Sequence, residues 1–184
     1  MTKSSSILLG GGCFWCVEAI LSPLRGVTSA RPGYAGGHIK NPTYEQVCTG
    51  QTGHAEVVKV DYDPRLISLS NLLRIFFTTH DPTQLDRQGN DIGTQYRSVI
   101  FGDEDQQKTA RTIKEEIEKE HIWPTPIVTA IEGPAHFWEA ELKHHDYFKH
   151  NPHTAYCAAV IAPKVAKARK LYQHYFLSDN KDKK

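Results

Sequence analysis

A short segment near the N-terminus combines groups that can carry out redox chemistry. The stretch GGGCFWCVE, residues 10–18, places Cys13 and Cys16 three positions apart with two aromatic residues between them. The apolar run 7–9 and the three glycines predict a strand, a turn and then a helix that begins at Cys13. Amide groups and the dipole at the start of a helix favour negative charge, so we predict a Cys13 thiol that ionises easily to the nucleophilic thiolate.

A CxxC pair taken alone is compatible with several kinds of site. It fits a thioredoxin-type dithiol, half of a zinc site, or a peroxide or sulfoxide reductase. Both cysteines can also be small buried apolar residues, although packing does not explain three glycines before a cysteine at a helix start. A zinc site needs two further ligands, for which Cys48, Cys157 and the histidines within 144–153 are the candidates.

The composition is that of one ordinary globular domain. The chain has 184 residues, of which 39% are apolar and 23% charged, and its net charge is +1. We therefore expect a single domain over 1–184, with flexible ends at 1–5 and 178–184 and no nucleic-acid partner. Neither a secretory leader nor the ~18 apolar residues of a membrane helix can be recognised. We expect a cytoplasmic protein, in which paired cysteines are more often catalytic or metal-binding than structural.

Hydrophobic periodicity indicates the elements that would position these groups. Strands are predicted at 7–9, 54–63, 96–101 and 127–131, and a further extended segment at 158–161. Helices are predicted at 14–21, 103–120, 137–149 and 163–176, and one more runs from the cap Ser70 to about His80.

Two long segments, 22–54 and 80–96, are interpreted as loops, and loops of this length in a compact domain are usually functional. In or beside them lie four motifs: GYAGG at 33–37, NPTY at 41–44, GQTGHAE at 50–56 and QGNDIGTQYRS at 88–98. Together with GCFWC, these motifs closely resemble the A-type peptide methionine sulfoxide reductases, in order and approximate spacing, over about residues 8–160. The coincidence of several independent motifs makes this resemblance far more specific than the CxxC pair.

The resemblance implies an α+β fold. It is a two-layer sandwich with a ferredoxin-like core, in which a mixed sheet carries helices on one face. The long functional loops would converge on the start of the first helix. The predicted order of strands and helices is compatible with this fold but does not select it.

The resemblance also assigns roles to residues in the motifs. Cys13 matches the nucleophile that attacks the sulfur of methionine sulfoxide, and Glu56 matches the carboxylic acid that protonates the sulfoxide oxygen. Such an acid stays protonated near neutral pH only if burial or a nearby negative charge raises its pKa. Tyr44 and Tyr96 match phenols that hydrogen-bond the oxygen, and Asp91 matches a second carboxylate that orients these groups and water.

Phe14 and Trp15 are explained by the same reaction. Two aromatic rings beside the nucleophile would form an apolar pocket for the S-methyl group of the substrate, because sulfur and methyl groups pack well on aromatic faces. We therefore predict that these two residues bind the substrate.

A second thiol must attack the Cys13 sulfenic acid that the reaction leaves. Cys16 stands where many family members carry glycine, and we prefer it as the first resolving thiol because it is closest in sequence. Cys157, in TAYC, matches a recycling cysteine of other members and could resolve the sulfenic acid itself or relay the disulfide. The second distal cysteine of some relatives is absent from the sequence, and Cys48 is expected to be structural.

The resemblance further implies thioredoxin as the external reductant, replaceable by dithiothreitol, and a monomer as the working form. The substrate would be the S epimer of methionine sulfoxide, free or in oxidised proteins, and the function would be repair of oxidative damage. The sequence contains no dinucleotide or phosphate-loop fingerprint, so we expect no bound NADPH, flavin or metal. A general dithiol oxidoreductase and a zinc-binding module are the alternatives.

Overall fold

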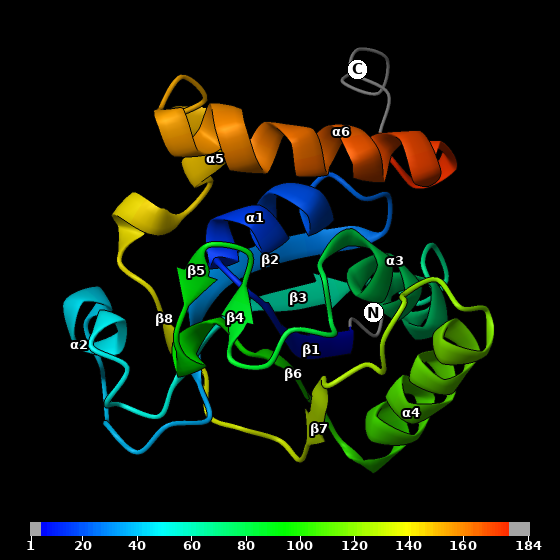
Figure 1. Cartoon of the computed structure of the whole chain (residues 1–184), viewed down its shortest axis with the longest axis horizontal. Helices are drawn as coiled ribbons and strands as arrows, with labels where there is room; N and C mark the ends of the chain where they lie inside the picture. Colours follow the sequence, from blue (N-terminus) through cyan, green and yellow to red (C-terminus); the bar gives the residue numbers. More distant parts are fainter. Residues whose placement is uncertain (1–4, 177–184) are drawn as a thin grey trace.

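A six-stranded sheet forms the centre of the structure, a computed structural model that describes residues 5–176 (Figure 1). Its strands are β1 (Ser5–Gly11), β2 (Val27–Ala35), β3 (Ala55–Tyr62), β6 (Ser98–Phe101), β7 (Ala130–Glu132) and β8 (Trp138–Glu139). They lie in the order β7-β6-β1-β3-β2-β8. All neighbouring pairs are antiparallel except β6 and β7, so the sheet is mixed.

The remaining elements surround this sheet. The helices are α1 (Phe14–Leu21), α2 (Tyr44–Cys48), α3 (Leu69–Thr79), α4 (Glu104–Lys119), α5 (Tyr147–His150) and α6 (Ala162–Leu171). A small hairpin consists of β4 (Arg87–Gln88) and β5 (Asp91–Ile92), and a π-helical turn at Cys157–Ile161 leads into α6. Among the described residues, no helix combines the length and apolar character needed to cross a membrane.

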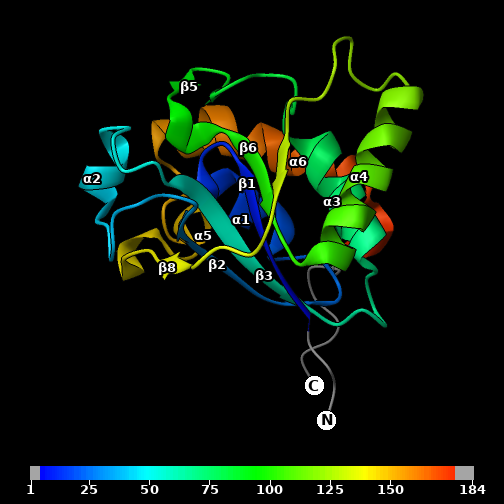
Figure 2. The same cartoon turned by 90° about the horizontal axis from the view of Figure 1, so that it is seen from below.

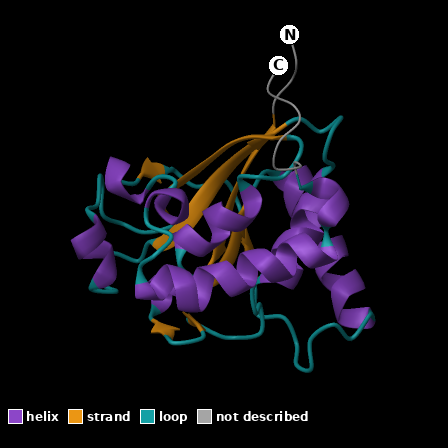
Figure 3. Cartoon of the chain, turned by 90° about the horizontal axis from the view of Figure 1, so that it is seen from above, coloured by secondary structure: helices purple, strands orange, loops and turns teal. Residues whose placement is uncertain are grey.

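Alternating side chains of the central strands define two faces of the sheet. Ile7 and Leu9 of β1 belong to the main core under the helices, whereas Leu8 between them belongs to a smaller cluster on the opposite face. Figure 1 shows α6 over α1 and α1 over the sheet, and Figure 3 shows these helices in front of the strands. Figure 2 views the opposite face, which the chain between β7 and β8 crosses, and Phe137 of this segment packs there.

The predicted α+β fold with a mixed sheet is confirmed. The helix predicted at 14–21 is α1, and α4 begins after the predicted cap Asp103, whose side chain accepts a hydrogen bond from the Gln106 amide group. Of the predicted flexible ends, 1–4 and 178–184 lie outside the described residues, and Ser5 is the first residue of β1.

Two predictions about longer segments are wrong. The segment 22–54 is not a loop throughout, since it contains β2 and α2. Pro32 and Gly33 obscure the strand pattern of β2, as these residues are unusual inside a strand. The helix predicted at 137–149 is replaced by β8, a 3₁₀ turn and α5, because this segment pairs with the edge of β2, where the Ala140 amide group donates to the Pro32 carbonyl at 3.0 Å.

Several element boundaries also differ from prediction. Ser68 rather than Ser70 caps α3, since its side chain accepts a hydrogen bond from the Asn71 amide group. The segment 158–161 is a π-helical turn and not extended, and Tyr96 ends a 3₁₀ turn before β6 begins. The antiparallel pairing of β1 and β3 places the end of β1 beside the start of β3, and the candidate site lies where these two strand ends meet.

Candidate active site

The turn between β1 and α1 is packed so tightly that side chains do not fit at its glycines. Gly12 has a φ of +93°, and a Cβ atom there would lie 2.6 Å from the Cβ atom of Gln88 in β4. A Cβ atom on Gly10 would lie 2.9 Å from Val99 and 3.0 Å from the carbonyl oxygen of Glu56. The glycines therefore let the hairpin and β3 approach the start of α1.

Cys13 is the N-cap residue of α1 and is buried. The first amide group of the helix, that of Phe14, donates to Glu56 Oε2 at 3.0 Å and not to the sulfur. Burial, the hydrogen bond with Cys16 and the charge of Glu56 raise the pKa of the Cys13 thiol well above its ordinary value. The prediction that the helix start ionises Cys13 is therefore wrong for this structure.

Cys16 is the thiol of the pair that ionises more easily. It is also buried, but the hydrogen bond from Cys13 lowers its pKa to about 7, and the charge of Lys164 and a hydrogen bond with Tyr156 act in the same direction. Burial and the charge of Asp91 oppose this change. Of the pair, Cys16 is therefore the thiol that ionises first, while burial keeps the proton on Cys13.

Glu56 carries the properties of a proton donor. Its side chain lies on the helix-covered face of β3 and is only 1% exposed. Burial is the main cause that raises its pKa to about 8; the charges of Asp91 and Cys16 add to this, and the hydrogen bond from Phe14 opposes it. The carboxyl group is consequently protonated at neutral pH, next to the first residue of the helix.

Aromatic rings gather on the other side of Cys13. The half-buried Trp15 stacks on Tyr147 with ring centres 3.7 Å apart and also faces Tyr44 at 6.4 Å. Its indole N–H donates to Nδ1 of the buried His144 at 3.1 Å. Phe14 is 1% exposed, so its ring supports this group from the core while Trp15 offers the accessible surface.

A partly buried network that the sequence analysis missed fixes the position of Tyr44. Glu141 accepts hydrogen bonds from the Tyr34 hydroxyl at 3.1 Å and from the Tyr44 amide group at 2.9 Å. It also lies 3.3 Å from His144 Nε2. Tyr34 stands in the GYAGG motif and was thus within reach of the sequence analysis, but Glu141 was hidden in the segment wrongly predicted as a helix.

The predicted site residues Asp91 and Tyr96 lie near the cysteines, and Tyr156, which was not predicted, lies beside them. The Tyr156 hydroxyl donates to Asp91 Oδ2 at 2.7 Å and lies 3.8 Å from Cys16 Sγ. Tyr96 and Tyr156 both pack on the cluster that contains Cys13 and Cys16. Tyr156 directly precedes Cys157, and this neighbour was the only sequence signal that pointed to it.

Comparison with known proteins shows the family of the chain. The model of the peptide methionine sulfoxide reductase family matches residues 5–175. The chain belongs to this family. A curated relative, peptide methionine sulfoxide reductase MsrA of Granulibacter bethesdensis, is 57% identical over 164 residues, which cover 89% of each chain.

Solved structures of family members agree in fold. Mxr1 from Saccharomyces cerevisiae in reduced form is 38% identical and has a TM-score of 0.77, with 84% of this chain and 90% of that chain covered. Mxr1 in complex with Trx2 is 28% identical and has a TM-score of 0.54, with 79% and 85% covered. As a member of the family, the chain is an oxidoreductase that reduces methionine sulfoxide with thiols.

The remaining cysteines of this family member occupy different environments. Cys157 is fully buried in the π-helical turn and packs in one cluster with Cys13, Cys16 and Ile161, so the fold brings the three thiols together. Cys48 is exposed at the end of α2, where its thiol is a hydrogen-bond partner of the Tyr44 side chain, and its structural role stays a prediction.

Two features bear on the alternative of a metal site. Within residues 5–176, no three histidine, cysteine, aspartate or glutamate side chains are grouped so that they could hold a metal ion. His54, from the GQTGHAE motif, is buried and ties loops together, since its ring nitrogens bond to the Gly37 amide group at 3.0 Å and the Ile39 carbonyl at 2.7 Å.

Proposed function

We propose that the chain reduces the S epimer of methionine sulfoxide, free or in oxidised proteins, through Cys13 as nucleophile and Glu56 as proton donor. One observation carries this proposal: a carboxyl group with a pKa of about 8 is buried and hydrogen-bonded to the amide group next to Cys13. A sulfoxide oxygen leaves sulfur only when it is protonated or strongly hydrogen-bonded, and this acid can supply the proton at neutral pH.

In the first step the Cys13 sulfur bonds to the sulfoxide sulfur. The Cys13 proton passes to the Cys16 thiolate, which is its hydrogen-bond partner. Glu56 protonates the oxygen, and Tyr44 and Tyr96 donate hydrogen bonds to it. The oxygen then passes to Cys13 while the bond between the two sulfurs and the S–O bond to the methionine sulfur break, so that the net products are a Cys13 sulfenic acid and the thioether of methionine.

Binding of the substrate uses the aromatic group around Trp15. Its accessible face receives the S-methyl group, and Phe14 supports that face from the core. Asp91 acts through the hydrogen bond that it accepts from Tyr156 and thereby orients the phenol beside Cys16.

The second step forms a disulfide. The Cys16 thiol loses its proton and attacks the Cys13 sulfur, the S–O bond breaks, and the leaving hydroxide takes up that proton to form water. Cys157, buried in the same cluster, then exchanges with this disulfide and relays it through the π-helical turn.

An external dithiol completes the cycle. We assign this role to thioredoxin, which dithiothreitol can replace, acting in the cytoplasm on a monomer that binds no cofactor or metal. The solved complex of the relative Mxr1 with Trx2 supports this choice of reductant.

The decisive experiment supplies each epimer of methyl-labelled methionine sulfoxide separately, with dithiothreitol, to the wild type and to Cys13→Ser. Only the S epimer is expected to be consumed, and only by the wild type. Equal consumption of both epimers, or activity in Cys13→Ser, would overturn the proposal. Counting free thiols after one turnover in Cys16→Ala and Cys157→Ala identifies the resolving cysteine, and an undiminished disulfide yield in Cys16→Ala would reassign it.

A further inference from the structure

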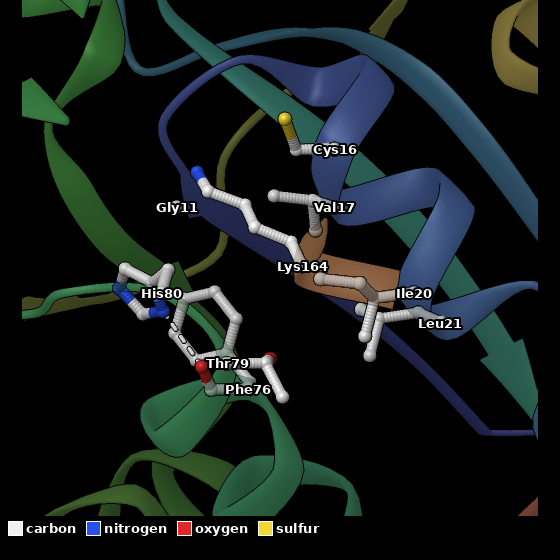
Figure 4. A pocket seen from close by; sticks show the side chains of 9 residues that line it. All are labelled: Gly11, Cys16, Val17, Ile20, Leu21, Phe76, Thr79, His80 and Lys164. Carbon is white, nitrogen blue, oxygen red and sulfur yellow. Dashed lines mark hydrogen bonds between the residues drawn. The ribbon is translucent and has the colours of Figure 1, made fainter. Parts of the chain in front are cut away.

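A small cavity lies behind Cys16, on the side of α1 that faces α3 and α6. Figure 4 shows that Cys16 and Val17 of α1, Phe76 and His80 at the end of α3, and Lys164 of α6 line it. Its volume is about 10 Å³, which is no more than one water molecule occupies. The Lys164 side chain extends into this cavity past Val17, with its ammonium group on the same side of α1 as the Cys16 sulfur, and its charge lowers the pKa of Cys16.

The position of Lys164 is unusual for a lysine. It lies within a continuous helical segment, since the π-helical turn runs directly into α6, and its side chain lines the cavity beside Cys16. Its side chain is half-buried, and among residues 5–176 no carboxylate lies within ion-pair distance of it. A negative charge on the facing sulfur would supply the missing partner.

The other charged and titratable groups around Cys16 do not supply a positive charge that could stabilise its thiolate. Cys13 and Tyr156 are neutral hydrogen-bond partners, while Asp91 and Glu56 bring negative charge when ionised. His80 is neutral at pH 7, because burial is the main cause that lowers its pKa to about 4. Among the residues that line the cavity, Lys164 therefore carries the positive charge.

We propose that Lys164 is a positioning residue that stabilises the Cys16 thiolate during the step that resolves the Cys13 sulfenic acid. This inference rests on the proposed function, in which Cys16 takes up the Cys13 proton in the first step and must lose it again. Once Cys13 carries oxygen, its sulfur has no thiol hydrogen to share with Cys16. Lys164 is then the positively charged group that favours loss of the proton, together with the hydrogen bond from Tyr156, and the proton leaves with the departing hydroxide as water.

The effect of removing the Lys164 charge on the rate of sulfenic acid resolution should change sign with pH. An opposite charge within several ångströms lowers a pKa by ~1 or more, so loss of Lys164 should raise that of Cys16 by about one. A more basic thiolate is also about threefold more nucleophilic, given a Brønsted slope of about 0.4–0.5. The neutral variant should therefore resolve the sulfenic acid about threefold more slowly at a pH well below the pKa of Cys16 in the sulfenic form, but ~2–3-fold faster at a pH well above it.

The test uses the full chain with Cys157→Ala, so that only Cys16 resolves. Lys164→Met keeps the apolar stem, Lys164→Arg keeps the charge, and Lys170→Met is the matched control on the exposed side of α6. Reduced enzyme is mixed with methionine sulfoxide without reductant, and methionine and the Cys13–Cys16 disulfide are quantified over time from pH 6 to pH 9. For Lys164→Met alone, the plot of the resolving rate against pH is expected to cross that of the enzyme with Lys164.

A second measurement reads the thiolate directly. In Cys13→Ser, Cys48→Ser, Cys157→Ala enzyme, the ultraviolet absorbance of the Cys16 thiolate is titrated with and without Lys164→Met, and a midpoint about one pH unit higher is expected for the variant. An unchanged midpoint, or an equal change in Lys164→Arg, overturns the inference.

The inference and the proposed function fail in different ways. A wild type that releases no methionine, or that forms no Cys13–Cys16 disulfide, overturns the proposed function or its resolving step and with it the inference. A wild type that does both, beside a Lys164→Met variant slowed by the same factor at every pH, overturns the inference alone, since a packing defect does not depend on thiol ionisation.

Discussion

Replacing Glu56 with glutamine tests whether the fold holds this carboxyl group protonated. The side chain is 1% exposed, and burial raises its pKa from 4.5 to about 8. Between these two pH values the native protein binds a proton that the unfolded chain releases, so the free energy of unfolding falls as pH rises. The slope is about 1.4 kcal/mol per pH unit, and the full loss above pH 8 is on the order of 4–5 kcal/mol.

Glu56→Gln removes this dependence because an amide does not ionise. Its oxygen can still accept the hydrogen bond that the Phe14 amide group donates at 3.0 Å. Relative to wild type, the variant should therefore gain about 2–3 kcal/mol of stability between pH 6 and pH 8. Its rate of methionine formation should be ~10²–10⁴-fold lower than that of the wild type. The wild-type rate should decline as pH rises through 8, and the rate of the variant should not show this decline.

Urea unfolding followed by tryptophan fluorescence from pH 5 to pH 9 measures the stability difference. Glu115→Gln, on the exposed face of α4, is the control and should show a constant difference from wild type. If the stability difference between Glu56→Gln and wild type is also the same at pH 6 and pH 9, the carboxyl group is not held protonated and the reasoning is refuted.

Three further changes probe the surroundings of the site. Tyr34→Phe removes the hydroxyl group that donates to Glu141 and should lower the free energy of unfolding by about 1–2 kcal/mol, which urea titration detects; no loss would contradict the network. Burial raises the pKa of Glu18 to about 7, so the native carboxyl group stays protonated between about pH 4.5 and pH 7, where the unfolded chain releases the proton. In the same urea assay, Glu18→Gln should therefore be more stable than wild type above about pH 7 but not below about pH 4. Trp15→Ala should raise KM on the order of tenfold with a smaller change in kcat, and a loss confined to kcat would argue against a role in binding.

Local sequence patterns were sufficient to predict those helices and strands that are determined by their own residues. The helix after Cys13 and the helix capped by Asp103 were predicted because apolar spacing and caps lie within each segment. β2 was missed because Pro32 interrupts its pattern and because pairing with β3 and β8 holds it. The segment around Glu141 was misread for the same reason, since its contacts reach residues about a hundred positions earlier.

The sequence by itself determined the chemical groups: a cysteine at a glycine-rich helix start, a second thiol three residues on, and the motifs that carry Glu56 and Asp91. Only the tertiary structure decided their ionisation. Dipole and amide effects at a helix start are local and favour a Cys13 thiolate, whereas burial and charges come from strands and helices that are distant in sequence. Those distant contacts keep the proton on Cys13 and Glu56 and place the positive charge of Lys164 behind Cys16.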